Sequence, residues 1–262
     1  MRFCVLASGS KGNATYVEGG GVRLLIDAGI SCRALEGRLA ALEVEPGTLD
    51  GILVTHEHSD HIDGLYRFAA KHKLPVYANE GTAAMVERQG QLRQLPVPEF
   101  AVFESRVPFA LGDLAVQPIR ISHDTAEPVA FTLADAAGGK LGYFTDLGYA
   151  TQEVATAMQG CTALVLESNH DEGMLRTSGR PYALITRIAG RVGHLSNDQA
   201  CELMQCACPD ALSCLVLAHL SHDCNAPDVA RAQMSRTLRT LGRDQVALAV
   251  ARQDAALALM EC

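Results

Sequence analysis

Short apolar runs bounded by turn residues dominate the first half of the chain. Runs of this kind, rich in Val, Ile, Leu and Tyr, are typical of β-strands. The predicted strands cover residues 2–7, 14–18, 22–27, 51–55, 114–122, 129–133 and 141–145. Three later apolar runs, over residues 163–167, 214–218 and 245–250, predict further short and buried strands. The pattern therefore indicates a protein with a strand-rich centre.

Apolar residues at helical spacing interrupt these strands and become more frequent in the second half. The predicted helices cover residues 32–42, 61–72, 82–89, 151–158, 181–191, 197–208 and 227–241. No linker rich in Pro, Gly or Ser, no low-complexity tract and no internal repeat divides the chain. We therefore expect one α/β domain over residues 1–262, with sheets in the middle and helices outside.

Composition excludes several classes of protein. The longest apolar runs, such as residues 246–251, fall far short of the roughly 20 residues of a membrane-spanning helix. The first ten residues lack the apolar core of a secretory signal, so we expect a cytoplasmic protein that does not bind membranes. The nine cysteines are expected to be reduced thiols. With a net charge of −8, any polyanionic substrate must be bound by a local patch.

The most informative segment follows the predicted strand 51–55. Four metal-binding side chains occur within six residues there: His56, His58, Asp60 and His61. Alternate residues at a strand end share a face, so His56 and His58 should point to the same side, and Asp60 and His61 should open the next helix. Imidazole and carboxylate groups suit zinc, iron or manganese. We favour this interpretation over histidines that merely cap the helix.

Three more candidate ligands each follow a predicted strand: His123, Asp146 and His219. A lone His or Asp in that position is commonly a turn or cap residue. Together with the cluster at residues 56–61, however, they supply what a two-metal site still needs, including a carboxylate that could bridge the ions.

The pattern His56-x-His58-x-Asp60-His61, followed by His123, Asp146 and His219, resembles that of the metallo-β-lactamase-fold hydrolases. The resemblance covers nearly the whole chain and implies a four-layer αββα sandwich. It implies two divalent metal ions, zinc or manganese, and Asp27 would be the family's early structural aspartate. The ligands that it implies are His56, His58 and His123 for one ion, Asp60, His61 and His219 for the other, and Asp146 as the bridge.

Four further segments, residues 7–14, 167–171, 193–197 and 218–221, resemble the YycJ/WalJ branch of this superfamily. Members of that branch are similar to DNA exonucleases and to phosphodiesterases of the RNase Z type. The chain departs from the branch at His222, where the relatives carry an acidic residue. His219 and His222 are thus both candidate ligands, and we favour His219 because it directly follows a predicted strand.

The expected activity is that of a metal-dependent phosphodiesterase, specifically a DNA exonuclease whose nucleophile is a metal-bridging hydroxide. The substrate is expected to be nucleic acid, most simply DNA, and no organic cofactor is implied. Asp60, Glu167 and His194 are the catalytic candidates, because the RNase Z resemblance implies that Glu167 orients His194 to protonate the leaving oxygen. The equally weighted alternative is that His194 caps a helix and Glu167 pairs with a buried arginine.

The locally basic segment 176–191 contains four arginines and no acidic residue. Arg187 and Arg191 should lie one helical turn apart on one face, and arginine forks match phosphate oxygens. We therefore list Arg180, Arg187 and Arg191 as substrate-binding candidates, with His170 lining the pocket. The alternative for the arginines is a solvated helix face paired with surface carboxylates.

Other functions remain open on sequence grounds. The same metal site could hydrolyse a small molecule, such as a cyclic phosphodiester or a thioester, and a metal-binding protein without activity is a more remote alternative. The loop at residues 8–12 fits neither a nucleophile elbow nor a P-loop; it either lines the metal site or simply connects two strands. A thiolate zinc site at Cys201, Cys206, Cys208 and Cys214 is disfavoured, because C-x2-C spacing is absent. The sequence does not predict the oligomeric state.

Overall fold

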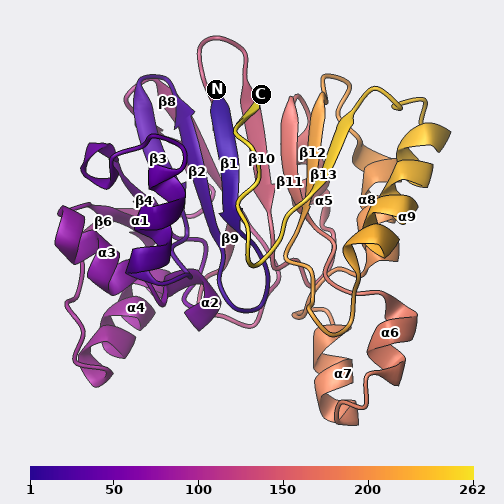
Figure 1. Ribbon diagram of the computed structural model, residues 1–262, viewed down its shortest axis with the longest axis horizontal. Coiled ribbons are helices and arrows are strands. Elements are labelled where there is room, and N and C mark those ends of the chain that lie inside the picture. Colours follow the sequence, from indigo (N-terminus) through magenta and orange to yellow (C-terminus); the bar gives the residue numbers. More distant parts are fainter.

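Two seven-stranded sheets form the centre of the protein, and the computed structural model describes residues 1–262 (Figure 1). The first sheet contains β1 (Arg2–Ala7), β2 (Ala14–Gly19), β3 (Val22–Ile26), β4 (Gly51–Leu53), β5 (Val76–Asn79), β6 (Phe100–Phe103) and β14 (Met260–Glu261). The second contains β7 (Phe109–Leu111), β8 (Leu114–Arg120), β9 (Val129–Ala134), β10 (Lys140–Phe144), β11 (Ala163–Glu167), β12 (Cys214–Ala218) and β13 (Ala247–Val250). The strand orders are β14-β1-β2-β3-β4-β5-β6 and β13-β12-β11-β10-β9-β8-β7.

Helices cover the outer face of each sheet (Figure 1). The first sheet is covered by α1 (Cys32–Ala40), α3 (Leu65–His72) and α4 (Glu80–Leu92), and the second by α5 (Gln152–Met158), α8 (Asn197–Ala207) and α9 (Pro227–Thr240). The remaining helices are η1 (Pro46–Thr48), α2 (Ser59–Ile62), α6 (Glu172–Thr177) and α7 (Tyr182–Ile188). This is the predicted four-layer αββα sandwich. None of the helices has the length and apolar character needed to cross a bilayer.

Three apolar clusters fill the spaces between the four layers. Alternate residues of a strand point to opposite faces of its sheet, and in β11 Val165 faces the other sheet while Leu164 and Leu166 face the helices. Because both faces are buried, the central parallel strands are continuously apolar, which is why the sequence predicted them. Both sheets contribute side chains to the middle cluster, as expected for one domain. The single domain over residues 1–262 stays a prediction.

The structure corrects two predicted helices. The helix expected over residues 61–72 is divided into α2 and α3, because the backbone at Gly64 passes so close to the β3–α1 connection that an added Cβ would lie 1.9 Å from the carbonyl oxygen of Ile30. The helix expected over residues 181–191 ends at Ile188, so Arg191 lies beyond it and not on a shared helix face with Arg187. The short strands β5, β6, β7 and β14 and the helices η1 and α6 were not predicted.

The strands that lead into the candidate ligands end at one edge of the sandwich. β3 and β4 run parallel, as do β10, β11 and β12, and this edge lies opposite the chain termini in Figure 1, where α2 is labelled. Asp27, Asp146 and His219 stand just beyond their strands with φ of 60°, 59° and 54°. L-residues adopt this left-handed conformation at a cost, and it is typical of functional positions.

Candidate metal centre

The loop after β4 brings two of its histidines to a third from the other sheet. Ligand atoms of His56, His58 and His123 lie within 4.8 Å of one another. Nδ1 of His58 is 3.2 Å from Nε2 of His123, which follows β8. The expected common orientation of His56 and His58 is thus present, because the extended backbone at the strand end places alternate side chains on one side.

A second group forms beside the first. Ligand atoms of Asp60, His61 and His219 also lie within 4.8 Å of one another, and Nε2 of His219 is 3.3 Å from Oδ2 of Asp60. Asp146 faces both groups: its Oδ2 lies 3.3 Å from Nε2 of His61, and its Oδ1 lies 3.7 Å from Nε2 of His123. The structure therefore brings together all seven candidate ligands, in the two sets that the family resemblance implied.

Hydrogen bonds from outside the cluster fix the orientation of three rings. Nδ1 of His61 is 2.8 Å from Oδ2 of Asp27, and Nδ1 of His219 is 2.9 Å from Oε1 of Glu167. Nδ1 of His123 is 3.0 Å from the carbonyl oxygen of Gly193. In each ring Nδ1 is held by an acceptor and Nε2 faces the cluster, which is the arrangement that orients metal-binding histidines.

The electrostatics of the cluster match the donor set of a divalent metal site. Nε2 of His56 is buried without any hydrogen-bond partner, and Oδ2 of Asp146 is buried with only the 3.3 Å approach of Nε2 of His61, which is not aligned as a hydrogen bond, so each retains a free ligand position. Burial alone would raise the pKa of Asp146, but His219 and His61 outweigh it and hold that pKa well below its ordinary value. A carboxylate that stays ionised among imidazoles, with lone pairs unused, fits a bound cation.

The loop between β1 and β2 lines the cluster while also connecting two antiparallel strands. Nδ2 of Asn13 is 3.1 Å from Nε2 of His61 and 3.3 Å from Oδ2 of Asp60. Oγ of Ser8 accepts a 2.7 Å hydrogen bond from the backbone N–H of His219. Both of the functions considered for this loop are therefore present, and Asn13 is a site residue that sequence reasoning missed, since a lone Asn after Gly also reads as a turn.

Glu167 is completely buried at the end of β11 and accepts four hydrogen bonds. Backbone N–H groups of Leu147 and Leu195 donate to Oε2 at 2.8 and 3.1 Å, and Nδ1 of His194 lies 2.9 Å from Oε1. Burial would raise the pKa of Glu167, but the imidazoles of His194 and His219 outweigh it and lower the pKa to about 2.

These contacts test the alternative interpretation of Glu167 and His194, whereas the proton-donating role stays a prediction. The residue that caps α8 is Ser196, whose side chain accepts from the backbone N–H of Gln199, so the helix-cap alternative for His194 is wrong. No arginine contacts Glu167, so the buried ion-pair alternative is wrong as well. The side chain of His194 is 22% exposed, whereas that of Glu167 is fully buried.

The candidate arginines lie around this edge and are mostly paired. Arg187 forms a 2.6 Å salt bridge with Asp124, a residue that sequence reasoning missed and whose Oδ1 lies 3.6 Å from Nε2 of His123. Arg180 pairs with Asp223 at 3.0 Å. The guanidinium of Arg191 stacks on the ring of Tyr149, 4.0 Å from its centroid. Pairing with carboxylates is what the solvated-face alternative expected for Arg180 and Arg187.

Two histidines outside the cluster are also placed. His222 has 78% of its side chain exposed and lies 2.8 Å from Asp223, so only His219 joins the candidate ligands. His170 follows β11, and its side chain is buried with Nδ1 lacking a hydrogen-bond partner. Burial lowers the pKa of His170 to about 4, which keeps this imidazole neutral at pH 7. His170 belongs to none of the groups whose ligand atoms converge, and neither do the cysteines between residues 201 and 214.

Buried amides lock the loops that hold His219 in place. Nδ2 of Asn169 donates a 2.7 Å hydrogen bond to the carbonyl oxygen of His219. Oγ of Ser168 donates to Oδ1 of Asn197 at 2.6 Å, and Nδ2 of Asn225 donates to that same atom at 2.9 Å. Fully satisfied buried networks of this kind hold a local conformation firmly. They explain why the sequence segments around residues 167–171 and 193–197 are polar although they are buried.

Comparisons with known proteins agree with this geometry. The family model for the beta-lactamase superfamily domain matches residues 22–219. The chain is 39% identical to exodeoxyribonuclease YycJ of Bacillus anthracis over 92% of this chain and 90% of the relative. It is 33% identical to exodeoxyribonuclease WalJ of Streptococcus pneumoniae, over 91% of this chain and 88% of that protein.

Solved structures share the fold at low sequence identity. The metallo-beta-lactamase fold protein YhfI from Bacillus subtilis superposes with a TM-score of 0.71 at 17% identity, covering 98% of both chains. Zinc-bound PqqB from Methylobacterium extorquens gives a TM-score of 0.73 at 16% identity, covering 98% of this chain and 99% of that one. Fold and cluster together define a metal-dependent hydrolase of the metallo-β-lactamase fold. Within this class, the chain belongs to the beta-lactamase superfamily domain family, in the branch that contains YycJ and WalJ.

Proposed function

We propose that this protein is a dinuclear metal-dependent phosphodiesterase that removes nucleotides from the ends of DNA. The observation that carries the proposal is the convergence of the seven candidate ligands in a chain that is 39% identical, over 92% of its length, to an exodeoxyribonuclease. The structural likeness to tRNase Z and to a PhnP-family protein supports the fold only. The choice of DNA as substrate rests on the exodeoxyribonuclease relatives.

The residues divide into two ion sites with one shared carboxylate. His56, His58 and His123 would hold one cation, Asp60, His61 and His219 the other, and Asp146 faces both. Two divalent cations bound there would activate water near neutral pH and offset the charge that develops on the phosphate. Zinc and manganese both suit this set of imidazole and carboxylate donors.

The proposed task of Glu167 and His194 is to handle the proton of the leaving group. Glu167 holds both His219 and His194 through Oε1, at 2.9 Å each, and so fixes the distance between a ligand and a partly exposed imidazole. A histidine whose Nδ1 is bound to a carboxylate presents Nε2 to the substrate and is well placed to donate a proton to the leaving oxygen. Asp60 would contribute as a metal ligand, and its side chain is 21% exposed.

The substrate test compares three phosphodiesters. Metal-loaded protein is incubated with 5′-labelled single-stranded DNA, with 5′-labelled double-stranded DNA and with bis(p-nitrophenyl) phosphate. Release of mononucleotides from DNA, lost in the His58→Ala variant, is the expected result. Cleavage of the small diester alone would replace the proposed nuclease with a small-molecule phosphodiesterase on the same site.

A further inference from the structure

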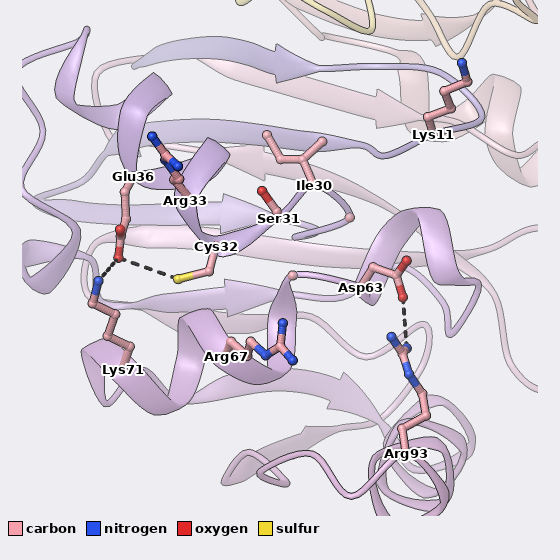
Figure 2. A pocket seen from close by; sticks show the side chains of 12 residues that line it. Lys11, Ile30, Ser31, Cys32, Arg33, Glu36, Asp63, Arg67, Lys71 and Arg93 are labelled. Carbon is pink, nitrogen blue, oxygen red and sulfur yellow. Dashed lines mark hydrogen bonds and ion pairs between the residues drawn. The ribbon is translucent and has the colours of Figure 1, made fainter.

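A cavity of about 670 Å³ opens beside the metal-binding loop, on the side of the first sheet (Figure 2). It is lined by the β1–β2 hairpin loop, the start of α1, the segment from Asp63 into α3, and the residue that caps α4. Five of the lining side chains are cationic: Lys11, Arg33, Arg67, Lys71 and Arg93. This is a dense positive patch in a protein whose net charge is −8.

Only part of this positive charge is compensated. Lys71 pairs with Glu36 at 2.7 Å, and Arg93 pairs with Asp63 at 2.8 Å. Lys11, Arg33 and Arg67 form no salt bridge. Figure 2 shows Arg67 between the two ion pairs, with its guanidinium directed into the open space. The cavity therefore offers unused guanidinium and ammonium donors, unlike Arg180 and Arg187 on the other half of the molecule, which are paired.

The cavity wall is fixed to the metal centre by direct backbone contacts. The N–H of Ala28 donates to the carbonyl oxygen of His61 at 2.8 Å, and the N–H of Gly64 donates to Ala28 at 2.9 Å. A Cβ on Gly29 would lie 1.7 Å from the carbonyl oxygen of Asp60, so only glycine permits this approach. The backbone that forms this wall of the cavity is thus held directly against the loop that carries Asp60 and His61.

The lining chemistry selects phosphate over nucleobase as the ligand. Only two lining residues, Ile30 and Cys32, are hydrophobic, and none is aromatic. Binding of bases in single-stranded nucleic acid relies on aromatic stacking, which this cavity lacks. Arginine forks and a lysine ammonium are instead the groups that bind phosphate oxygens.

We propose that this cavity binds phosphate groups of the nucleic acid strand whose scissile phosphate lies at the metal centre, with Arg33, Arg67 and Lys11 as the contacting cations. The inference rests on the proposed function and adds to it a substrate-binding site that is independent of base sequence. Phosphate contacts position a strand without reading it, so the site predicts strong salt dependence and little sequence preference.

The test uses two double variants with the same change in charge. Arg33→Ala/Arg67→Ala removes two unpaired cations of the cavity, and Arg236→Ala/Arg239→Ala removes two exposed cations from α9, in the other half of the protein. KM for a fluorescent single-stranded DNA is measured over a range of salt concentrations, beside kcat/KM for bis(p-nitrophenyl) phosphate. We expect the cavity variant to raise KM for DNA roughly tenfold and to reduce the salt slope by about 1.4, with both effects absent in the control. Turnover of the small diester should be unchanged in both variants.

A cavity variant with the KM and salt slope of the wild type would overturn the phosphate site while leaving the nuclease proposal intact. If the wild type cleaves no DNA, the same strand is titrated into chelator-treated proteins and its fluorescence anisotropy is recorded. Weaker binding by the cavity variant alone would then support the phosphate site although the proposed function had failed. Equal binding by all three proteins would overturn it.

Strands with a 5′-phosphate and with a 5′-hydroxyl distinguish the two possible sources of the bound group. If the cavity holds a terminal phosphate, the effect of Arg33→Ala/Arg67→Ala should be confined to the phosphorylated strand. If it holds internal phosphates of the backbone, the variant should raise KM equally for both strands.

Discussion

Glu167 holds His219 by a 2.9 Å hydrogen bond between Nδ1 of the imidazole and Oε1 of the buried carboxylate. The same oxygen is 2.9 Å from Nδ1 of His194, so one carboxylate orients a candidate metal ligand and the candidate proton donor together. The relationship links the candidate metal site to the candidate proton donor through a carboxylate that is entirely enclosed and whose oxygens accept four hydrogen bonds.

Replacement of Glu167 by Gln should weaken metal binding. The variant keeps the shape of the side chain but loses the charge that favours the tautomer with Nδ1 protonated, and such outer partners typically change metal affinity by about 10- to 100-fold. Competition with a chelating dye measures the affinity. Glu172→Gln, an exposed position on α6, is the matched control and should bind metal like the wild type. Equal affinity in the two variants would remove Glu167 from the support of the site.

His194→Gln should lower turnover without lowering metal affinity. General acid catalysis contributes about 10²- to 10⁴-fold, so kcat on DNA should fall by roughly a hundredfold or more. The loss should be far smaller with bis(p-nitrophenyl) phosphate, because its phenolate leaving group needs no proton. Paired kinetic measurements on the two substrates test this, and equal losses would contradict proton donation by His194.

Charge reversal at Arg187 tests whether the arginines in and after α7 bind the substrate. Arg187→Glu breaks the salt bridge with Asp124 and places two like charges at the rim of the metal cluster. KM for DNA should rise and its salt dependence should weaken, and Arg191→Glu should do the same if Arg191 also contacts the strand. Arg236→Glu on α9 is the control. Unchanged KM and salt response in both variants would assign these arginines to the solvated surface.

Burial of Cys161 predicts loss of stability at alkaline pH. The side chain is enclosed behind β10, and burial raises its pKa from 9.0 to about 11. The thiol stays protonated in the folded protein while it ionises in the unfolded chain. Its contribution to stability is therefore complete below pH 9 and is lost progressively up to about pH 11. Urea denaturation at pH 8 and pH 10.5 should show a loss that is on the order of 1–2 kcal/mol smaller in Cys161→Ala than in the wild type. Identical losses would contradict this assignment.

The candidate ligands could be predicted because each follows a strand that an apolar run in the sequence predicts. His56, Asp146 and His219 stand where β4, β10 and β12 end, and parallel strands deliver their carboxyl ends to one edge. What sequence pattern could not supply is contact between distant segments. Asp124 pairs with Arg187, and Asn13 reaches His61, through the packing of loops that local periodicity does not describe.

The errors in the predicted elements have the same origin. Gly64 divides α2 from α3 because the β3–α1 connection passes against it, a tertiary contact that is invisible in the helical pattern of residues 61–72. Arg191 leaves the helix because the chain turns after Ile188 to place His194 beside Glu167. The cationic cavity could not be predicted because Lys11, Arg33 and Arg67 are separated in sequence and line one cavity only after folding.

The central claim is that metal bound by the seven-residue cluster drives phosphodiester hydrolysis of DNA. Protein stripped with chelator is titrated separately with zinc and with manganese while nucleotide release from 5′-labelled DNA is recorded, for the wild type and for Asp146→Ala. We predict no release before metal is added, full activity near two equivalents of at least one metal, and loss of both metal binding and hydrolysis in Asp146→Ala. Hydrolysis by stripped protein, or retained turnover in Asp146→Ala, would contradict the account.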